Sequence, residues 1–467
     1  MLRFRTGEIQ LVALFSASVV FQLFIPPSIG LANNGDFAKM IGRFSLAPGS
    51  LDTSEEYRYF TEHWVYDRSF QWVSDDRSSE LIPISAAVLT GWWFSSHRFD
   101  IRTLGAIHAV LWIACFAAFV LLLRRLAGWR RYITGIAALF IFTDVSYIAY
   151  CNSFYTDVAA FLFLAWAVVL WLHFINSQRP SPGLFVMFVG TAILCVSSKS
   201  QHALLAIFLC VLAVVAALSF EGRWRRAAIA LSLLILLAAG VTFKLMPDPE
   251  KGPAQYAVIF MSILHGSPRP LDDARELGLG PEYLRYVDFW PRHPSGDPLA
   301  NPEWRALFAS RTNYGRIAQF YLRHPWRALG IVYRVLKERA GRRRPALGNY
   351  ERAYGFPPGA QTTSFGWWSA LRSALFRVAP WHIVAWYAGI LGIGIRLAIR
   401  PATVPARISL FAILLAAMGL VELAVSSLAD AGETERHLLL FHVITDFTIM
   451  LAIAWGVTRV NDRRRHG

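Results

Sequence analysis

Long apolar runs alternate with short polar segments along most of the chain. A helix needs about 20 apolar residues to cross a bilayer, and we predict about ten such spans. They lie at residues 9–30, 102–123, 132–151, 157–174, 183–198, 202–219, 227–245, 378–398, 408–428 and 438–457. The run at 81–94 is shorter, so we expect a juxtamembrane helix on the outer surface, with Trp92 and Trp93 at the interface.

Arginine clusters beside the apolar runs predict the orientation of the spans. With ten spans, the clusters at 124–131, 223–226 and 463–465 share one side with Arg3 and Arg5. Cytoplasmic loops carry such an excess of basic residues. Counting 81–94 as a further span would place the cluster at 124–131 outside. We therefore predict a multi-pass protein of the cytoplasmic (inner) membrane with both termini in the cytoplasm.

This pattern predicts an all-α polytopic membrane protein with three regions. Prolines, glycines and both signs of charge become frequent after the seventh span, which indicates a large extracytoplasmic segment. Within it, the basic stretch 323–344 is expected to be an amphipathic surface helix. The regions are an N-terminal membrane domain at 1–245 with its first extracytoplasmic loop at 31–100, an extracytoplasmic loop domain at 246–375, and C-terminal transmembrane helices at 376–467.

Composition agrees with the membrane assignment and excludes other classes. The chain is 55% hydrophobic and 16% charged, with a mean hydropathy of +0.40, which is too apolar for a soluble domain. A net charge of +15 can indicate nucleic-acid binding. Here the basic residues flank spans and no nucleic-acid motif accompanies them, so no nucleic-acid partner is expected. The four cysteines have no paired spacing, which argues against a disulfide framework or a metal site.

Four polar segments lie at the predicted outer ends of the spans. They are NNGDF at 33–37, NSFYTD at 152–157, KSQH at 199–202 and DAGETERH at 430–437. We predict that they meet in one pocket at the outer face of the membrane. Asn-Asn-Gly-Asp is equally good turn and N-cap chemistry, so Asp36 has a structural alternative.

Sugar transfer from a lipid phosphate suits such a pocket. A carboxylate such as Asp36 can take the proton of the attacking hydroxyl, and cations such as Lys199 and Arg436 can stabilise charge on the leaving phosphate. The other candidate contacts to substrate come from the same segments and from one buried acid. They are Asn34, Asn152, Tyr155, Gln201, His202, His437 and Asp144.

Asp144 lies within the third predicted span, where an ionisable group is costly and therefore a functional candidate. Its alternative is a hydrogen bond to a neighbouring helix. We interpret Glu422 and Asp446, also within spans, as structural.

The order of these motifs resembles the GT-C integral-membrane glycosyltransferases, and more closely bacterial glycan-biosynthesis hexose transferases of the wall-synthesis type. The similarity extends over nearly the whole chain and includes SSKSQ, LGNYERAYGFPPGAQ and ADAGETERHLLLF. It implies transfer of a hexose from a polyprenyl-phosphate donor to a cell-envelope glycan or lipid-linked acceptor. It also implies that Asp36 is the catalytic carboxylate and Asp157 the second acidic residue of the site.

Two departures from that family pattern concern metal use. The first loop lacks an adjacent acidic pair, and Asp157 stands in a TD context without D-x-D. A divalent metal is thus an open alternative, but no cofactor is favoured, because enzymes with lipid-monophosphate donors generally resemble metal-independent ones.

Three other functions are alternatives to the transferase. A transporter or flippase of lipid-linked sugars would place ionisable residues at mid-membrane within repeated halves, and this chain shows no repeat. A non-catalytic scaffold would tolerate the loss of Asp36, Asp157 and Lys199. A glycan polymerase or ligase acting on lipid-pyrophosphate glycans is the alternative within the enzyme class.

Overall fold

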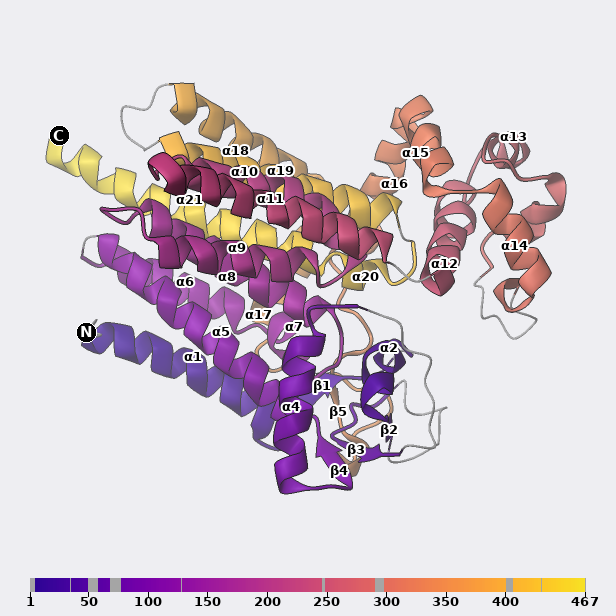
Figure 1. Cartoon of the computed structure of the whole chain (residues 1–467), viewed down its shortest axis with the longest axis horizontal. Helices are drawn as coiled ribbons and strands as arrows, with labels where there is room; N and C mark the ends of the chain where they lie inside the picture. The colour runs from indigo at the N-terminus through magenta and orange to yellow at the C-terminus, as the bar shows by residue number, and fades with distance from the viewer. Residues whose placement is uncertain are drawn as a thin grey trace.

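The computed structural model is mostly helical, and its membrane-spanning helices form one bundle (Figure 1). It describes residues 5–33, 35–48, 58–67, 77–126, 128–245, 248–289, 298–399, 406–429 and 431–466. Both termini lie at one end of the bundle, while the short strands and helices α2 (Phe37–Ile41) and α20 (Thr434–His437) lie at the opposite end. We call this opposite end the loop end.

Among the described residues, eight helices are long and apolar enough to cross a membrane. This count confirms a multi-pass membrane protein. The spans are α1 (Thr6–Phe24), α5 (Arg102–Leu122), α8 (Asp157–Ile175), α10 (Leu205–Ala217, after a 3-10 turn at Ser200–Leu204), α11 (Gly222–Lys244), α18 (His382–Ile399), α19 (Ala406–Leu428) and α21 (Leu439–His466).

Two predicted spans differ from that description. The third is bent by 55° between α6 (Arg130–Phe142) and α7 (Val145–Ile148), so it counts as a ninth span only as a broken helix. The bend occurs where the Asp144 carboxylate accepts the backbone N–H of Ser146 and begins a new helix. The fifth is α9 (Pro182–Val196), whose 15 residues reach about 22 Å, less than a bilayer core of about 30 Å.

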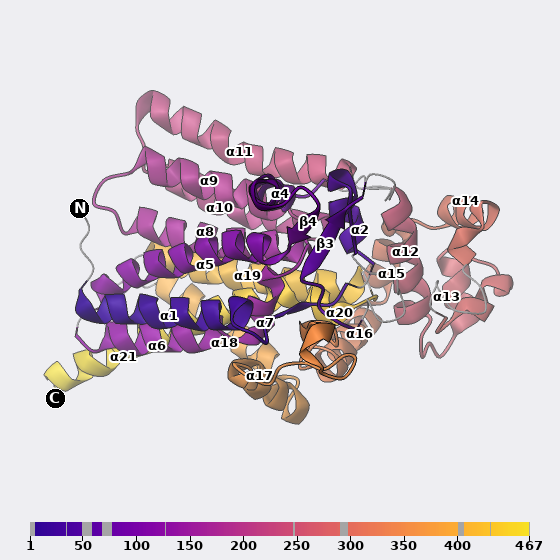
Figure 2. The ribbon, with the colours of Figure 1, turned by 90° about the horizontal axis from the view of Figure 1, so that it is seen from below.

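The short apolar run at 81–94 forms α4 (Leu81–Phe94). In Figure 2 this helix is seen end-on while the spans run across the view, so α4 lies across them. Trp92 and Trp93 are 56% and 90% exposed. This orientation agrees with the predicted juxtamembrane surface helix and explains why the run can be too short to span.

The expectation of an all-α fold is wrong in one respect, because two small antiparallel sheets stand at the loop end. In the first, β1 (Ile29–Leu31), directly after the first span, pairs with β5 (Leu347–Tyr350). The second has the order β2 (Leu46–Pro48), β3 (His63–Tyr66), β4 (Arg98–Asp100). The strands are three or four residues long, so no alternating pattern marks them in the sequence. Their pairing holds the chain on both sides of Asp36.

The segment between α11 and α18 packs in two places. Helices α12 (Asp248–Val258), α13 (Pro270–Glu276), α14 (Pro302–Arg311), α15 (Tyr314–Arg323) and α16 (Pro325–Glu338) surround a separate apolar cluster that includes Phe260, Tyr283, Phe308 and Phe320. Most of this unit extends beyond the loop end (Figure 1). In contrast, β5 and α17 (Trp367–Val378) pack against the membrane bundle. Of the stretch 323–344 predicted to be an amphipathic helix, only Pro325–Glu338 forms one, as α16.

Candidate active site

Asp36 is positioned by the turn chemistry that the NNGDF motif offers. The Asn33 side-chain oxygen accepts the backbone N–H groups of Gly35 at 2.8 Å and Phe37 at 3.3 Å. Gly35 adopts φ +97°, which a side chain would strain. Asp36 follows at the start of α2. The turn and the candidate carboxylate are therefore parts of one arrangement, while Asn34 lies outside the described residues.

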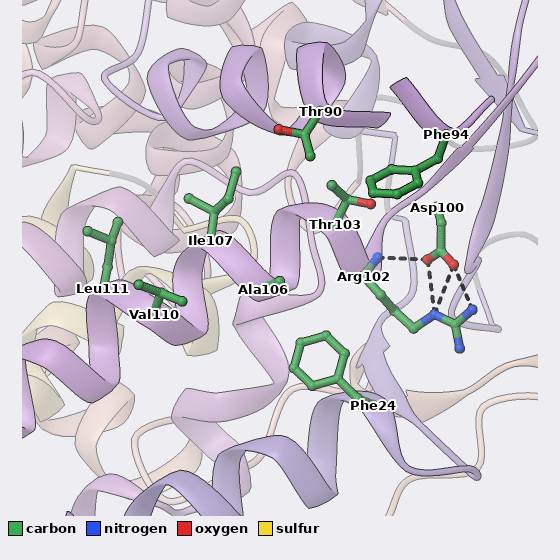
Figure 3. A pocket seen from close by; sticks show the side chains of 10 residues that line it. All are labelled: Phe24, Thr90, Phe94, Asp100, Arg102, Thr103, Ala106, Ile107, Val110 and Leu111. Carbon is green, nitrogen blue, oxygen red and sulfur yellow. Dashed lines mark hydrogen bonds and ion pairs between the residues drawn. The ribbon is translucent and has the colours of Figure 1, made fainter. Parts of the chain in front are cut away.

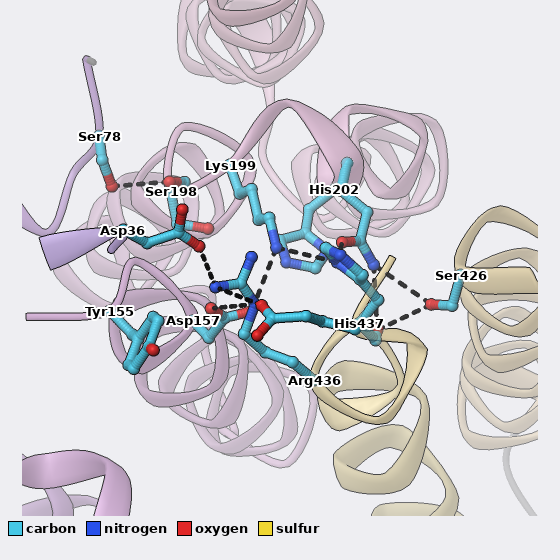
Figure 4. A network of polar contacts seen from close by, with 12 residues as sticks. Asp36, Ser78, Tyr155, Asp157, Ser198, Lys199, His202, Ser426, Arg436 and His437 are labelled. Carbon is cyan, nitrogen blue, oxygen red and sulfur yellow. Dashed lines mark hydrogen bonds and ion pairs between the residues drawn. The ribbon is translucent and has the colours of Figure 1, made fainter. Parts of the chain in front are cut away.

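Arg436 joins the acidic groups of three segments (Figure 4). Its guanidinium forms an ion pair with Asp36, lies 3.2 Å from Glu433, and has Nε 3.9 Å from Asp157. Asp157 is the first residue of α8, and Arg436 belongs to α20, which precedes α21. The side chains of Arg436 and Asp157 are 9% and 4% exposed. Residues far apart in the sequence thus share one buried guanidinium.

Lys199 and His437 extend this network on the other side of Asp157. Lys199 Nζ lies 3.4 Å from the Asp157 carboxylate and 3.0 Å from His437 Nδ1. The same His437 nitrogen lies 2.6 Å from Oε1 of Gln201. The amide of Gln201 donates to the His437 backbone carbonyl at 3.0 Å. His202 Nδ1 is 3.0 Å from the carboxylate of Glu422. Glu422, which the sequence indicates to be structural, therefore borders the network.

Arg344 completes the network from a segment that sequence reasoning did not select. It donates to the hydroxyl of Tyr155 at 2.9 Å and to Glu433 at 2.8 Å. The guanidinium groups of Arg344 and Arg436 lie 4.7 and 5.2 Å from the Tyr155 ring centroid. The only sequence signal for Arg344 is its place in a basic run, where most arginines face solvent or headgroups.

Ser78 and Ser79 attach the first outer loop to the Lys199 segment. The Ser78 hydroxyl donates to the Ser198 backbone carbonyl at 2.6 Å (Figure 4). The Ser79 hydroxyl donates to Leu194, and its N–H donates to Ser197. These hydrogen bonds hold the backbone of residues 194–198 and thereby restrict the position of Lys199, which follows directly.

Among the described residues, ion pairs connect seven charged side chains around Arg436. They are Asp36, Asp157, Glu433, Lys39, Lys199, Arg344 and Arg436. These seven side chains comprise four cations and three carboxylates, an excess of one positive charge. Burial opposes ionisation of Asp36, but Arg436 and Lys39 outweigh it and hold the pKa of Asp36 well below its usual range. Asp36 is therefore ionised at neutral pH and, while paired, weakly basic.

The four predicted segments therefore meet at the loop end, and two predicted substrate contacts lie outside the network. The Asn152 amide donates to the backbone carbonyls of Leu23 and Ile29, joining the end of α1 to β1. Asp144 caps α7 and accepts hydrogen bonds from Ser369. Both residues have structural contacts instead of a place beside Arg436.

No group of three or more His, Cys, Asp or Glu side chains that could hold a metal ion occurs among the described residues. The carboxylates of the network are instead paired with arginine and lysine. Metal-independent chemistry stays a prediction.

A groove of about 700 Å³ lies between α4, α5 and the end of α1 (Figure 3). Apolar side chains such as Ile107, Val110 and Phe94 line most of it, and Arg102 with Asp100 stands at one end. Arg102 forms a forked contact with Asp100 at 2.6 to 3.1 Å. None of the seven charged residues of the network lines this groove.

Beside this groove, Glu351 gives a testable pH dependence. Burial and the neighbouring Glu62 carboxylate raise the pKa of Glu351 to about 7. An unfolded glutamate titrates near pH 4.3, so the contribution of Glu351 to stability is greatest below about pH 4.3 and declines as pH rises through about 7. We expect Glu351→Gln to raise the thermal midpoint over that of the wild type, more at pH 8 than at pH 5.

Thermal denaturation of the detergent-solubilised protein at both pH values measures this difference. Glu338→Gln, at an exposed position of α16, is the matched control and should show the same midpoint shift at both pH values. An equal effect of Glu351→Gln at pH 5 and pH 8 would contradict the assignment.

Comparison with known protein families decides the class of the chain. One family model, described as the YfdI N-terminal transmembrane domain, matches residues 4–466. The chain belongs to this family. The description of the family as a transmembrane domain agrees with the multi-pass bundle. No curated protein and no solved structure matches the chain significantly.

Proposed function

We propose that this YfdI-family protein transfers a hexose from a polyprenyl-phosphate donor to a cell-envelope glycan or lipid-linked acceptor. The observation that carries the proposal is the ion-pair network around the buried Arg436 at the loop end of a membrane bundle. Family membership and the resemblance to GT-C enzymes support membrane glycosyl transfer. With the termini in the cytoplasm, as the arginine clusters predict, the reaction takes place at the outer face of the cytoplasmic membrane.

The charge of the network favours an anionic ligand. The excess positive charge would be neutralised by one phosphate diester. Among the described residues, the buried Nη1 of Arg344 has no hydrogen-bond partner, and Nε of Arg436 has only the ion pair with Asp157 at 3.9 Å. Buried polar groups are normally hydrogen-bonded, and arginine donors suit phosphate oxygens. We therefore place the donor phosphate between Arg344, Arg436 and Lys199.

Asp36 would act as the base once the donor is bound. A phosphate that draws Arg436 away from Asp36 weakens that ion pair and makes the carboxylate more basic. The acceptor oxygen then bonds to the anomeric carbon and its proton passes to Asp36. The bond between the anomeric carbon and the phosphate oxygen breaks, and polyprenyl phosphate leaves with the electron pair.

Asp157 would act through its partners. Its carboxylate lies between Lys199 and Arg436, so it orients both cations. Its 4% exposure leaves little room for direct contact with an acceptor hydroxyl in this conformation. In the proposed reaction Asp157 is accordingly a positioning residue.

A reconstituted transfer assay tests the function. Purified protein in proteoliposomes receives radiolabelled polyprenyl-phosphate hexose and envelope glycan acceptors. We expect a new glycosidic bond and release of polyprenyl phosphate. Movement of the intact donor across the bilayer without bond formation would instead identify a flippase and overturn the proposal.

Lys199→Met tests the phosphate contact within that assay. Loss of one charge-assisted hydrogen bond costs about 1.5–3 kcal/mol, so the donor KM should rise about 10- to 100-fold. Lys337→Met, at an exposed position of α16, is the matched control and should leave KM unchanged. An unchanged donor KM in Lys199→Met would remove Lys199 from the phosphate site.

A further inference from the structure

Helix α17 has the reverse of the amphipathic pattern of a water-soluble surface helix. Its exposed face is apolar apart from Arg377 near the C-terminal end, and the apolar positions recur at helical spacing as one stripe. The stripe consists of Trp367, Ala370, Leu371, Ala374, Leu375 and Val378. Trp367 is 68% exposed and Val378 is 84% exposed. Isolated apolar side chains on a surface need no explanation, but a continuous apolar stripe does.

Arg377 at the C-terminal end is exposed, whereas Trp368, Ser369 and Arg372 lie on the other face and contact the bundle. Ser369 donates from its backbone N–H to Asp144 at 2.9 Å, and Trp368 donates to Asp446 at 2.9 Å. Arg372 donates to the Tyr147 hydroxyl at 3.0 Å and lies 3.8 Å from Asp446. Charged groups at membrane depth face the protein interior in this way.

The elements beneath α17 belong to the spans. Asp446 is on α21, and Tyr147 is on α7 of the broken span. Figure 2 shows α17 at the flank of the bundle, away from α13 and α14. Its 12 residues reach about 18 Å, too little to cross a bilayer.

The apolar stripe of α17 continues one on α6, the first part of the broken span. Exposed Ile133, Ile136 and Phe140 lie on one face of α6, and the Phe140 ring stacks on Trp367 with centroids 6.1 Å apart. If the exposed face of α6 contacts lipid, the adjoining face of α17 contacts lipid as well. We infer that α17 is a non-spanning helix embedded in one leaflet of the bilayer, with its apolar stripe against the lipid hydrocarbon.

This inference changes the place of the segment and is independent of the proposed reaction. Residues 367–378 then belong to the membrane rather than to the extracytoplasmic loop domain predicted at 246–375. The inference also gives Asp144 and Asp446 a role, because they supply polar partners for Ser369, Trp368 and Arg372 on the inner face of α17.

Depth-dependent fluorescence quenching tests the location. Leu371→Cys carries a small environment-sensitive label in phosphatidylcholine nanodiscs, with or without lipids bearing a nitroxide near the top of the acyl chain. Because an interfacial helix lies about 5–10 Å below the headgroup boundary, we expect the label to lose more than about half of its fluorescence. Leu375→Cys, one turn further, should behave alike.

Leu307→Cys on α14 is the matched control, since Leu307 and Leu371 are 46% and 47% exposed. Its label should respond to aqueous iodide and not to the lipid nitroxide. Unmodified protein measures labelling of the four native cysteines, all buried. Iodide quenching at residue 371 would place α17 in water. Protection from both quenchers, with energy transfer between two labelled copies, would place it in a protein dimer. Either result overturns the inference.

Discussion

Replacement of Asp36 by asparagine is expected to abolish hexose transfer while leaving a folded, membrane-inserted protein. Loss of a general base lowers the rate by about 10²–10⁴-fold. Asparagine keeps the shape of the side chain, and Arg436 retains Glu433 and Asp157 as partners. Turnover with polyprenyl-phosphate hexose measures the effect, and gel filtration in detergent verifies the fold.

Asp100→Asn is the matched control for Asp36→Asn. Asp100 also pairs with an arginine at the loop end, through Arg102, but it lies outside the Arg436 network. The control should retain near-normal transfer. Near-normal turnover by Asp36→Asn itself would remove the base assignment.

Replacement of Arg436 by methionine is expected to be the most destabilising change in the network. It removes one partner of each of three carboxylates, of which Asp157 is the most buried. Removing one partner of a buried ion pair costs about 3–5 kcal/mol. Thermal or denaturant unfolding of the detergent-solubilised protein measures this loss.

A double variant separates the charge effect from lost packing. Arg436→Met combined with Asp157→Asn also removes the charge of a carboxylate that has lost its contact with Arg436. The double variant should therefore be more stable than Arg436→Met alone. If the two changes are simply additive, the pairing between Arg436 and Asp157 contributes nothing to stability. The seven-charge network would then not be held together through this arginine.

The meeting of Asp36, Asp157, Lys199 and Arg436 could be predicted because each lies next to the end of an apolar run. Alternation of the spans places these ends on one side, and a bundle brings them close. This prediction requires only that the spans pack beside one another in a bundle. The same logic failed for Asn152, which is near a span end but hydrogen-bonds to Leu23 and Ile29 inside the fold.

Arg344 and Glu433 could not be selected from the sequence. Arg344 lies in a basic run within the long segment between α11 and α18, and only pairing of β5 with β1 brings that segment to Tyr155. Asp144, in contrast, was predicted to contact substrate but has structural contacts. The burial of a carboxylate within a span can be predicted from the sequence, but its hydrogen bond with Ser369 depends on how α17 packs.

Eight of the ten span positions, the separate short helix at 81–94 and the gathering of polar groups at one end follow from the sequence alone, because hydrophobic length and charge bias act locally along the chain. The tertiary structure decided which polar groups touch, how Arg436 is shared among three carboxylates and which way α17 faces. Those properties depend on contacts between segments separated by up to several hundred residues, such as Asp36 with Arg436, and no local pattern encodes them.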